Sequence, residues 1–368
     1  MDVPTWVWAA TVLGVLGLLV FDFYAHVRTP HEPTFRESAT WSAVYIALAI
    51  LFGVGLLAVW GPGHGGEYFA GYVTEKSLSV DNLFIFLIIM TRFAVPRPYQ
   101  QKVLLVGVAI ALFLRGLFIW AGAAAIEQFS WVFYVFGAFL VYTAIKLARE
   151  HHQDDAPAEF HENRMLRLAR RVLPTTTEYH GDRLTVVQHG RRLVTPMLLV
   201  MIAIGSTDVL FALDSIPAIF GLTKEPYIVF TTNAFALLGL RQLYFLIGGL
   251  LERLVYLSQG LSFILAFIGV KLVLEAMHTN EVPFINRGEH VAWAPEIPIW
   301  LSLTVILGTL TVATVASLIS TRRARVVADA QRQAQEQGLG TPAEELDSPA
   351  TVVPRGDSAE GGSGEASR

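Results

Sequence analysis

Four carboxylates stand inside long apolar stretches of this 368-residue chain. Glu75 and Asp81 lie in EKSLSVDNLFIF, and Asp208 and Asp214 lie in STDVLFALDSIP, so the two acids of each pair are six positions apart. A charged side chain at the centre of a membrane-spanning helix costs roughly 2.5–3.5 kcal/mol on insertion scales. These acids must therefore face a cavity or basic partners, which indicates a functional site.

Amide and hydroxyl groups follow the second acid of each pair in the sequence. Carboxylate, amide and hydroxyl oxygens are the ligands that hard cations such as magnesium, calcium and manganese prefer. We therefore predict a cation site. Its candidate ligands are Glu75, Asp81, Asn82, Asp208, Asp214 and Ser215.

Helix geometry complicates a single site. Six residues turn a straight helix by about 240°, so the two acids of a pair do not share one face. Pro217 predicts a break beside Asp214, because proline clashes with the carbonyl four residues earlier. No proline follows Asp81, so no equivalent break is predicted in the first segment.

Basic residues leave an alternative open. The charge-compensating candidates are Arg115, Arg241, Lys146 and Lys271. They can pair with the four acids as structural ion pairs without any metal. Asp22 and His26 share one helical face near the end of the first apolar run and form a candidate gate. The HHQDD stretch and His161 offer further metal-binding groups, although a solvated charged loop is the simpler interpretation.

The composition sets the fold class. Only 16% of the residues are charged and 53% are hydrophobic, whereas a soluble domain has about 25% charged residues. Apolar runs of about 20 residues recur along the chain, and each can cross a bilayer. We predict an all-α polytopic membrane bundle of about nine spans. They lie near residues 6–25, 41–61, 67–92, 101–124, 128–148, 194–222, 227–251, 255–277 and 297–319.

Lys and Arg gather on one side of these spans if the N-terminus lies outside and the C-terminus lies in the cytoplasm of a plasma-membrane protein. The N-terminal run has no basic leader segment, so we expect a retained helix. The predicted regions are two N-terminal helices (1–66), a three-helix unit (67–148), a cytoplasmic loop with a short helix near 163–172 (149–193), a second three-helix unit (194–277), an extracellular loop with the final span (278–320) and a disordered cytoplasmic tail (321–368).

The two three-helix units look like copies. Each carries two acids six positions apart, then an arginine and then a lysine. Because each unit has an odd number of spans, the second copy enters the membrane from the opposite side. Such inverted repeats are common in secondary transporters, where the substrate binds near the midplane.

The segments GYVTEKSLSVDNLFIF, FALDSIPAIFG and PYIVFTTNAFALLGLRQLYF resemble the signature segments of the TerC family of integral membrane proteins, from about Trp41 to Met277. The resemblance implies a relation to LysE-like exporters and a role in manganese export, beside the tellurium-resistance name. It puts weight on the six candidate ligands. Translocon or stress-complex partners are implied by the resemblance alone, and the cytoplasmic loop and tail fall outside it.

We therefore expect an exporter of a divalent cation, with manganese as the leading candidate and calcium or magnesium as alternatives, that is not an enzyme and has no permanent cofactor and no nucleic-acid partner. Absence of cysteine excludes thiolate metal sites and disulfides. The rival is a membrane scaffold for a stress response such as tellurite resistance, in which the buried charges are structural. An intramembrane aspartyl hydrolase is disfavoured, since GSTD and ALDS lack the GxGD context.

Overall fold

The computed structural model is helical over most of the residues that it describes. These are 1–27, 31–129, 131–150, 166–167, 171–176, 178–188, 191–247, 256–278, 291 and 294–336, and the side chains of 26, 27, 81, 127, 150 and 322–336 are not included. The chain divides into two units, Met1–Leu318 and Ile319–Arg368. The candidate site lies in the first unit.

The helices of the first half are α1 (Thr5–Asp22), a short π-helix η1 (Phe23–Val27), α2 (Phe35–Trp60), α3 (Pro62–Arg92), α4 (Arg97–Gln128) and α5 (Val132–Glu150). Those of the second half are α7 (Pro196–Phe220), α8 (Pro226–Leu237), α9 (Leu240–Ile247), α10 (Leu257–His278) and α11 (Ile299–Glu336). A proline opens α3, α4, α7 and α8 in the first turn, where its missing N–H costs nothing. Thr34 and Glu37 form a reciprocal capping box at the start of α2.

Seven helices among the described residues are long and apolar enough to cross a membrane. Two of the nine predicted spans are missing from this set. α3 is 31 residues long, but it carries several charged residues. The predicted span 227–251 is divided into α8 and α9, which are each too short. The chain is thus a multi-pass helical membrane protein, and the count of nine spans stays a prediction.

The helix break occurs at Gly239 and was predicted at the wrong place. α7 runs through Pro217 to Phe220, so Pro217 removes one hydrogen bond near the helix end without interrupting the helix. The chain leaves the helix instead between α8 and α9, where Gly239 has a φ of 81°. Only glycine adopts this conformation without steric cost.

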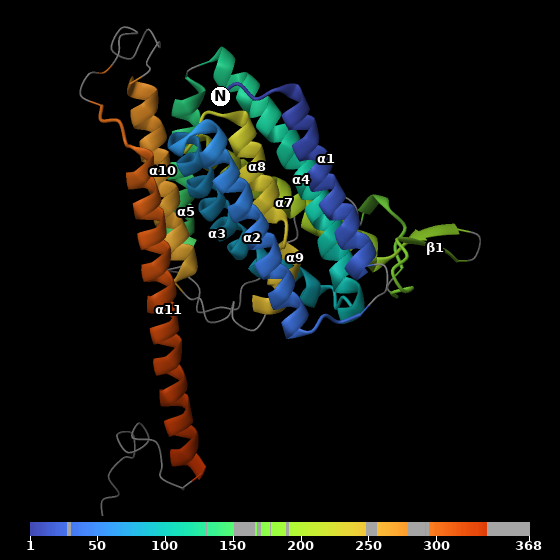
Figure 1. Cartoon of the computed structure of the whole chain (residues 1–368). Coiled ribbons are helices and arrows are strands. Elements are labelled where there is room, and N and C mark those ends of the chain that lie inside the picture. Colours follow the sequence, from blue (N-terminus) through green and yellow to red (C-terminus); the bar gives the residue numbers. More distant parts are fainter. Residues whose placement is uncertain are drawn as a thin grey trace, which may run out of the picture. The chain divides into compact units, whose positions relative to one another are not determined.

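The central helices pack in a reciprocal pattern. α3 packs against α8 and α4 against α7, while α5 lies along α10 (Figure 1). α3 also contacts α7, and α4 contacts α8. If α3, α4 and α5 are exchanged with α7, α8 and α10, respectively, this set of pairings stays the same. The pattern supports the inverted repeat, which remains a prediction.

Two parts of the chain differ from expectation. The predicted cytoplasmic loop contains an antiparallel hairpin, β1 (Thr185–Gln188) and β2 (Arg191–Val194), which the all-α prediction omitted. The predicted tail is not disordered from its start, because α11 continues to Glu336. The stretch 321–336 is rich in Ala, Arg and Gln, which favour helices. Residues 337–368 and His161 lie outside the described residues.

Glycine permits the closest approach of α5 and α10. A Cβ atom on Gly137 would lie 2.9 Å from the Gly269 carbonyl oxygen, and one on Gly269 would lie 3.0 Å from the Gly137 carbonyl oxygen. Any side chain at either position must therefore push the two backbones apart.

We expect Gly137→Ala and Gly269→Ala to destabilise the protein by about 1–3 kcal/mol, the usual cost of overpacking. Thermal unfolding of the detergent-purified protein, followed by tryptophan fluorescence, measures this as a lower midpoint. Gly116→Ala is the matched control, because a Cβ there meets nothing within 4 Å. Equal midpoints for all three variants would contradict the predicted close contact.

Candidate cation site

Arg115 of α4 is the centre of a buried polar cluster that four helices build. Its Nη1 atom forms an ion pair with Glu75 of α3 and donates a hydrogen bond of 2.9 Å to Asn233 Oδ1 of α8. Its Nη2 atom lies 3.4 Å from Asp208 Oδ1 of α7. None of the four side chains is more than 2% exposed. The first acids of the two sequence pairs thus meet at one guanidinium group.

The cluster has spare negative charge and spare oxygen atoms. Two carboxylates and one guanidinium group have a formal net charge of −1. Within the described part of the chain, the buried oxygens without a hydrogen bond include Glu75 Oε2 and Asp208 Oδ2, and also Ser79 Oγ and Ser215 Oγ, which lie about one turn after Glu75 on α3 and about two turns after Asp208 on α7. A buried polar atom without a partner costs about 1–3 kcal/mol. These oxygens are therefore suited to a ligand that satisfies them.

The structure does not bring all six candidate ligands together. Asp214 is half-buried, accepts a hydrogen bond of 3.2 Å from Thr143 Oγ1 of α5, and is attracted by the positive charge of Lys146. Because α7 is continuous, Asp208 and Asp214 point to different faces, as the 240° separation requires. Asn82 is buried on α3, while the side chain of Asp81 lies outside the described residues.

Arg241 pairs with Asp22 and with none of the three intramembrane acids whose side chains are described, Glu75, Asp208 and Asp214. The guanidinium group approaches the Asp22 carboxylate at 2.7 and 3.2 Å, and it also bonds to Gln101. Tyr45 and Gln242 each donate a further hydrogen bond to Asp22. The candidate gate residue Asp22 is thus buried in a network that joins α1, α2, α4 and α9. The side chain of its predicted companion His26 is not described.

Lys76 binds backbone carbonyl groups at the break between α8 and α9. Its ammonium group donates to the carbonyl oxygen of Ala236 at 3.0 Å and lies 3.5 Å from that of Leu238. The carbonyls at a helix C-terminus have no partner in the helix and attract positive charge. Lys76 therefore stabilises the junction of α8 and α9, directly beside Glu75 in the sequence.

A second, charged cavity of about 480 Å³ lies at one end of α3, α7 and α10. Its lining includes Glu67, Thr223, Lys224, Lys271 and Glu275. Thr223 donates to Glu67 at 2.6 Å, and Lys224 donates to Glu275 at the same distance. Lys271 is 8% exposed, and the negative charges of Glu275 and Glu67 attract its ammonium group. Glu67 precedes Glu75 by eight positions, or about 12 Å along the α3 axis.

Three polar residues in or beside these clusters were not among the predicted site residues. Asn233 contacts Arg115, Lys76 contacts the helix break, and Glu67 lines the charged cavity. A polar residue within an apolar span was the available signal for Asn233. Among the residues that the structure describes, no three His, Asp or Glu side chains gather closely enough to hold a metal ion.

Replacing Arg115 should destabilise the protein strongly. Arg115→Gln leaves two carboxylates buried without a counter-charge, and removing one partner of a buried ion pair typically costs about 3–5 kcal/mol. Adding Asp208→Asn should recover part of this loss. The measurement is again the thermal midpoint in detergent, with exposed Arg97→Gln as the control. An Arg115→Gln midpoint equal to that of the unchanged protein would argue against the pairing.

Comparison with known proteins agrees with the sequence pattern. The family model described as "Integral membrane protein TerC family" matches residues 60–325. An uncharacterized membrane protein of Mycobacterium tuberculosis is 52% identical over 86% of this chain and 80% of its own length. One from Myxococcus xanthus is 41% identical over 86% and 93%, respectively. A protein of Escherichia coli named as a membrane-bound redox modulator, Alx, is 36% identical over 82% and 91%. No solved structure matches. The resemblance is thereby confirmed, and the chain belongs to the TerC family of integral membrane proteins.

Proposed function

We propose that this TerC family protein is a secondary exporter of a hard divalent cation, with manganese as the leading candidate. The observation that carries the proposal is the convergence of Glu75 and Asp208, from two different helices, in the buried centre of the bundle. Their unbonded oxygens and those of nearby serines belong to the ligand type that manganese, magnesium and calcium share.

Arg115 acts as the counter-ion of the empty site. With its single charge it leaves the cluster at a formal −1, whereas a divalent cation balances both carboxylates. The arriving cation therefore competes with the guanidinium group for the same oxygens. Asn233 keeps a hydrogen bond to Arg115 available on the α8 side, so the displaced guanidinium group retains a polar partner. This exchange changes the formal charge of the cluster from −1 in the empty state to +1 in the loaded state, in which Asn233 Oδ1 remains as the polar partner of Arg115.

The export route follows α3. The predicted orientation places Asp81 and Asn82 on the cytoplasmic side of Glu75, and places Glu67 with its charged cavity on the outer side. A cation would pass from Asp81 and Asn82 to the Glu75–Asp208 site and leave through the cavity. Asp214, beside Thr143 and Lys146, offers a further acid on the α5 side. Coupling to protons or to the membrane potential supplies the energy in a chain without a nucleotide-binding motif.

Removing a carboxylate charge should abolish export. We expect Glu75→Gln, Asp208→Asn and Asp214→Asn to reduce manganese flux at least tenfold in proteoliposomes that contain a manganese-sensitive dye. Asp182→Asn is the matched control, because Asp182 pairs with Lys102 at the protein surface and should leave the flux unchanged. Undiminished flux through correctly inserted Glu75→Gln and Asp208→Asn variants would refute the central site. Competition by calcium or magnesium in the same assay identifies the preferred ion.

The scaffold alternative rests on the same contacts. Arg115 already neutralises much of the Glu75–Asp208 charge, as a purely structural ion pair would. The redox-modulator name of the E. coli relative suggests a stress role, but thiol chemistry is closed to a chain without cysteine.

Truncation separates the two functions. A scaffold should fail in a stress-survival assay when the chain is cut after Asp329, and it should tolerate Asp81→Asn. The exporter should show the reverse: the truncated protein keeps manganese flux and cellular manganese balance, and Asp81→Asn loses both. A truncated protein that loses all flux while Asp81→Asn keeps it would favour the scaffold.

A further inference from the structure

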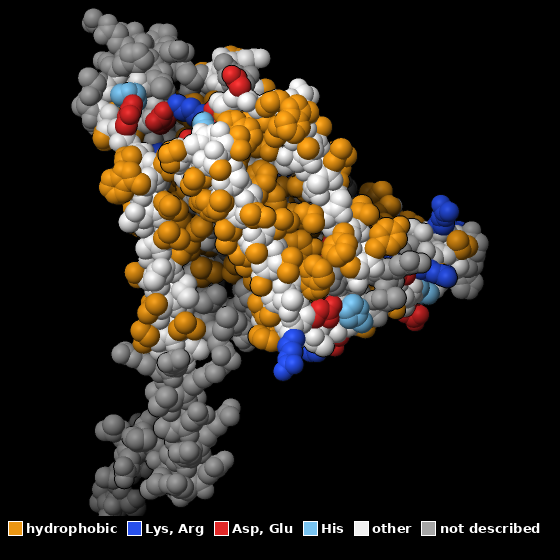
Figure 2. Space-filling view, viewed as in Figure 1, with side chains coloured by type: hydrophobic (Ala, Val, Ile, Leu, Met, Phe, Trp, Pro, Cys, Tyr) orange, Lys and Arg blue, Asp and Glu red, His pale blue; other side chains and the backbone are white. Residues whose placement is uncertain are grey.

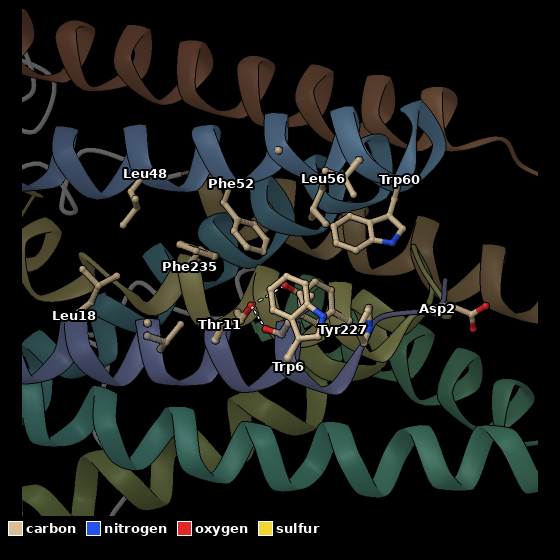
Figure 3. Close-up of a pocket in the computed structure, with 17 residues that line it drawn as sticks. Asp2, Trp6, Thr11, Leu18, Leu48, Phe52, Leu56, Trp60, Tyr227 and Phe235 are labelled. Carbon is tan, nitrogen blue, oxygen red and sulfur yellow. Dashed lines mark hydrogen bonds between the residues drawn. The ribbon is translucent and has the colours of Figure 1, made fainter.

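A long apolar groove of about 940 Å³ runs between α1 and α2, with α8 at its base. Figure 3 shows side chains of α1 and α2 along its two sides, with Tyr227 and Phe235 of α8 between them. Both walls are candidate membrane spans. Hydrophobic side chains also cover the face of the molecule around these helices (Figure 2).

Two glycines leave this groove open. Gly14 of α1 and Gly55 of α2 line it, and a Cβ atom at either position would meet nothing within 4 Å. Glycine within a helix costs about 1 kcal/mol relative to alanine. At Gly53, Gly137 and Gly269 a close neighbour explains the glycine, since a Cβ would approach it to 3.0 Å or less. At Gly14 and Gly55 no such neighbour lies within 4 Å, so close packing does not explain these two glycines. Their effect is to leave the groove open.

The surroundings decide what fills that space. Protein interiors are close-packed, and an apolar groove between two membrane spans is in contact with the hydrocarbon of the bilayer. The groove extends on α1 from Pro4 to Leu18, or about 21 Å at 1.5 Å per residue. One leaflet of hydrocarbon is about 15 Å thick. An extended acyl chain that enters at the leaflet surface can therefore lie along most of the groove, about 15 Å of its length of about 21 Å.

The end of the groove at the N-terminus of α1 has interfacial chemistry. Trp6 and Trp60 line this end together with Asp2, as labelled in Figure 3. Tryptophan prefers the headgroup level of a membrane. Asp2 is the one charged side chain among the described residues of the lining, so this end favours a headgroup with a positive group over an anionic one.

Side chains of α1 contact α8 beside this groove. Thr11 Oγ1 and Tyr227 Oη share a hydrogen bond of 2.7 Å, and Trp8 packs edge-on against the Tyr227 ring. We propose that this groove is a binding site for one zwitterionic phospholipid, such as phosphatidylethanolamine, whose acyl chain packs between α1 and α2. The lipid then contributes the packing that α1 and α2 do not supply to each other. This proposal is independent of the transported ion.

The test fills the groove from either wall. Gly14→Leu and Gly55→Leu place side chains in the open space, and Gly17→Leu is the matched control because Gly17 is equally uncrowded but does not line the groove. Each full-length protein is extracted from bilayers of equal parts phosphatidylethanolamine and phosphatidylglycerol, washed with detergent, and examined by native mass spectrometry.

We expect the unchanged protein and Gly17→Leu to retain one phosphatidylethanolamine per chain. Both groove variants should lose at least about 80% of this lipid, because the leucine side chain occupies the space of its acyl chain. Added phosphatidylethanolamine should raise the thermal midpoint of the first two proteins alone. Two variants on opposite walls guard against misfolding of either one. Equal lipid retention by all four proteins would overturn the proposal. So would preferred retention of phosphatidylglycerol, or a dimer that the groove variants convert to monomer with lipid unchanged.

Discussion

The burial of Arg115 between Glu75 and Asp208 is the constraint on which the centre of this protein depends. Charges in hydrocarbon are expensive, and they become tolerable only when opposite charges and hydrogen-bonding groups lie within reach. Here α3, α4, α7 and α8 each contribute one member, so the contacts of Arg115 connect all four helices. The same balance is incomplete by one formal charge, and the proposed binding of a cation rests on this excess of negative charge.

The broken helix beside the cluster follows the same physics. Between α8 and α9 the backbone leaves the helix at Gly239, and its carbonyls need partners that lipid cannot provide. Lys76 supplies them, one position after Glu75 on α3. The site helix and the broken helix are thus linked twice, once through Arg115 and Asn233 and once through Lys76. A displacement of Arg115 by an ion would act on this junction through the hydrogen bond to Asn233 of α8.

Charges away from the centre are matched locally. Asp22 and Arg241 neutralise each other within a network of amide and hydroxyl groups, and Glu67, Lys271 and Glu275 share the charged cavity. Between these polar regions the outer surfaces of α1 and α2 are apolar, with the glycine-lined groove between them. The bundle therefore presents an apolar surface to lipid on α1 and α2, and these charged groups lie in its interior and at its ends.

The sequence by itself determined the membrane class, the family and the approximate positions of most long helices, because hydropathy, proline and charge act over short stretches of chain. It also named Glu75, Asp208 and Arg115, which are buried in the structure, as candidate site residues. Only the tertiary structure decided which of them meet: Arg115 with the first acid of each pair, and Arg241 with Asp22. It also moved the helix break from Pro217 to Gly239, and revealed the β1–β2 hairpin and the continuation of α11. Which acid pairs with which base depends on which helix faces pack together. Local sequence pattern does not contain this information for residues more than 90 positions apart, such as Arg115 and Asp208.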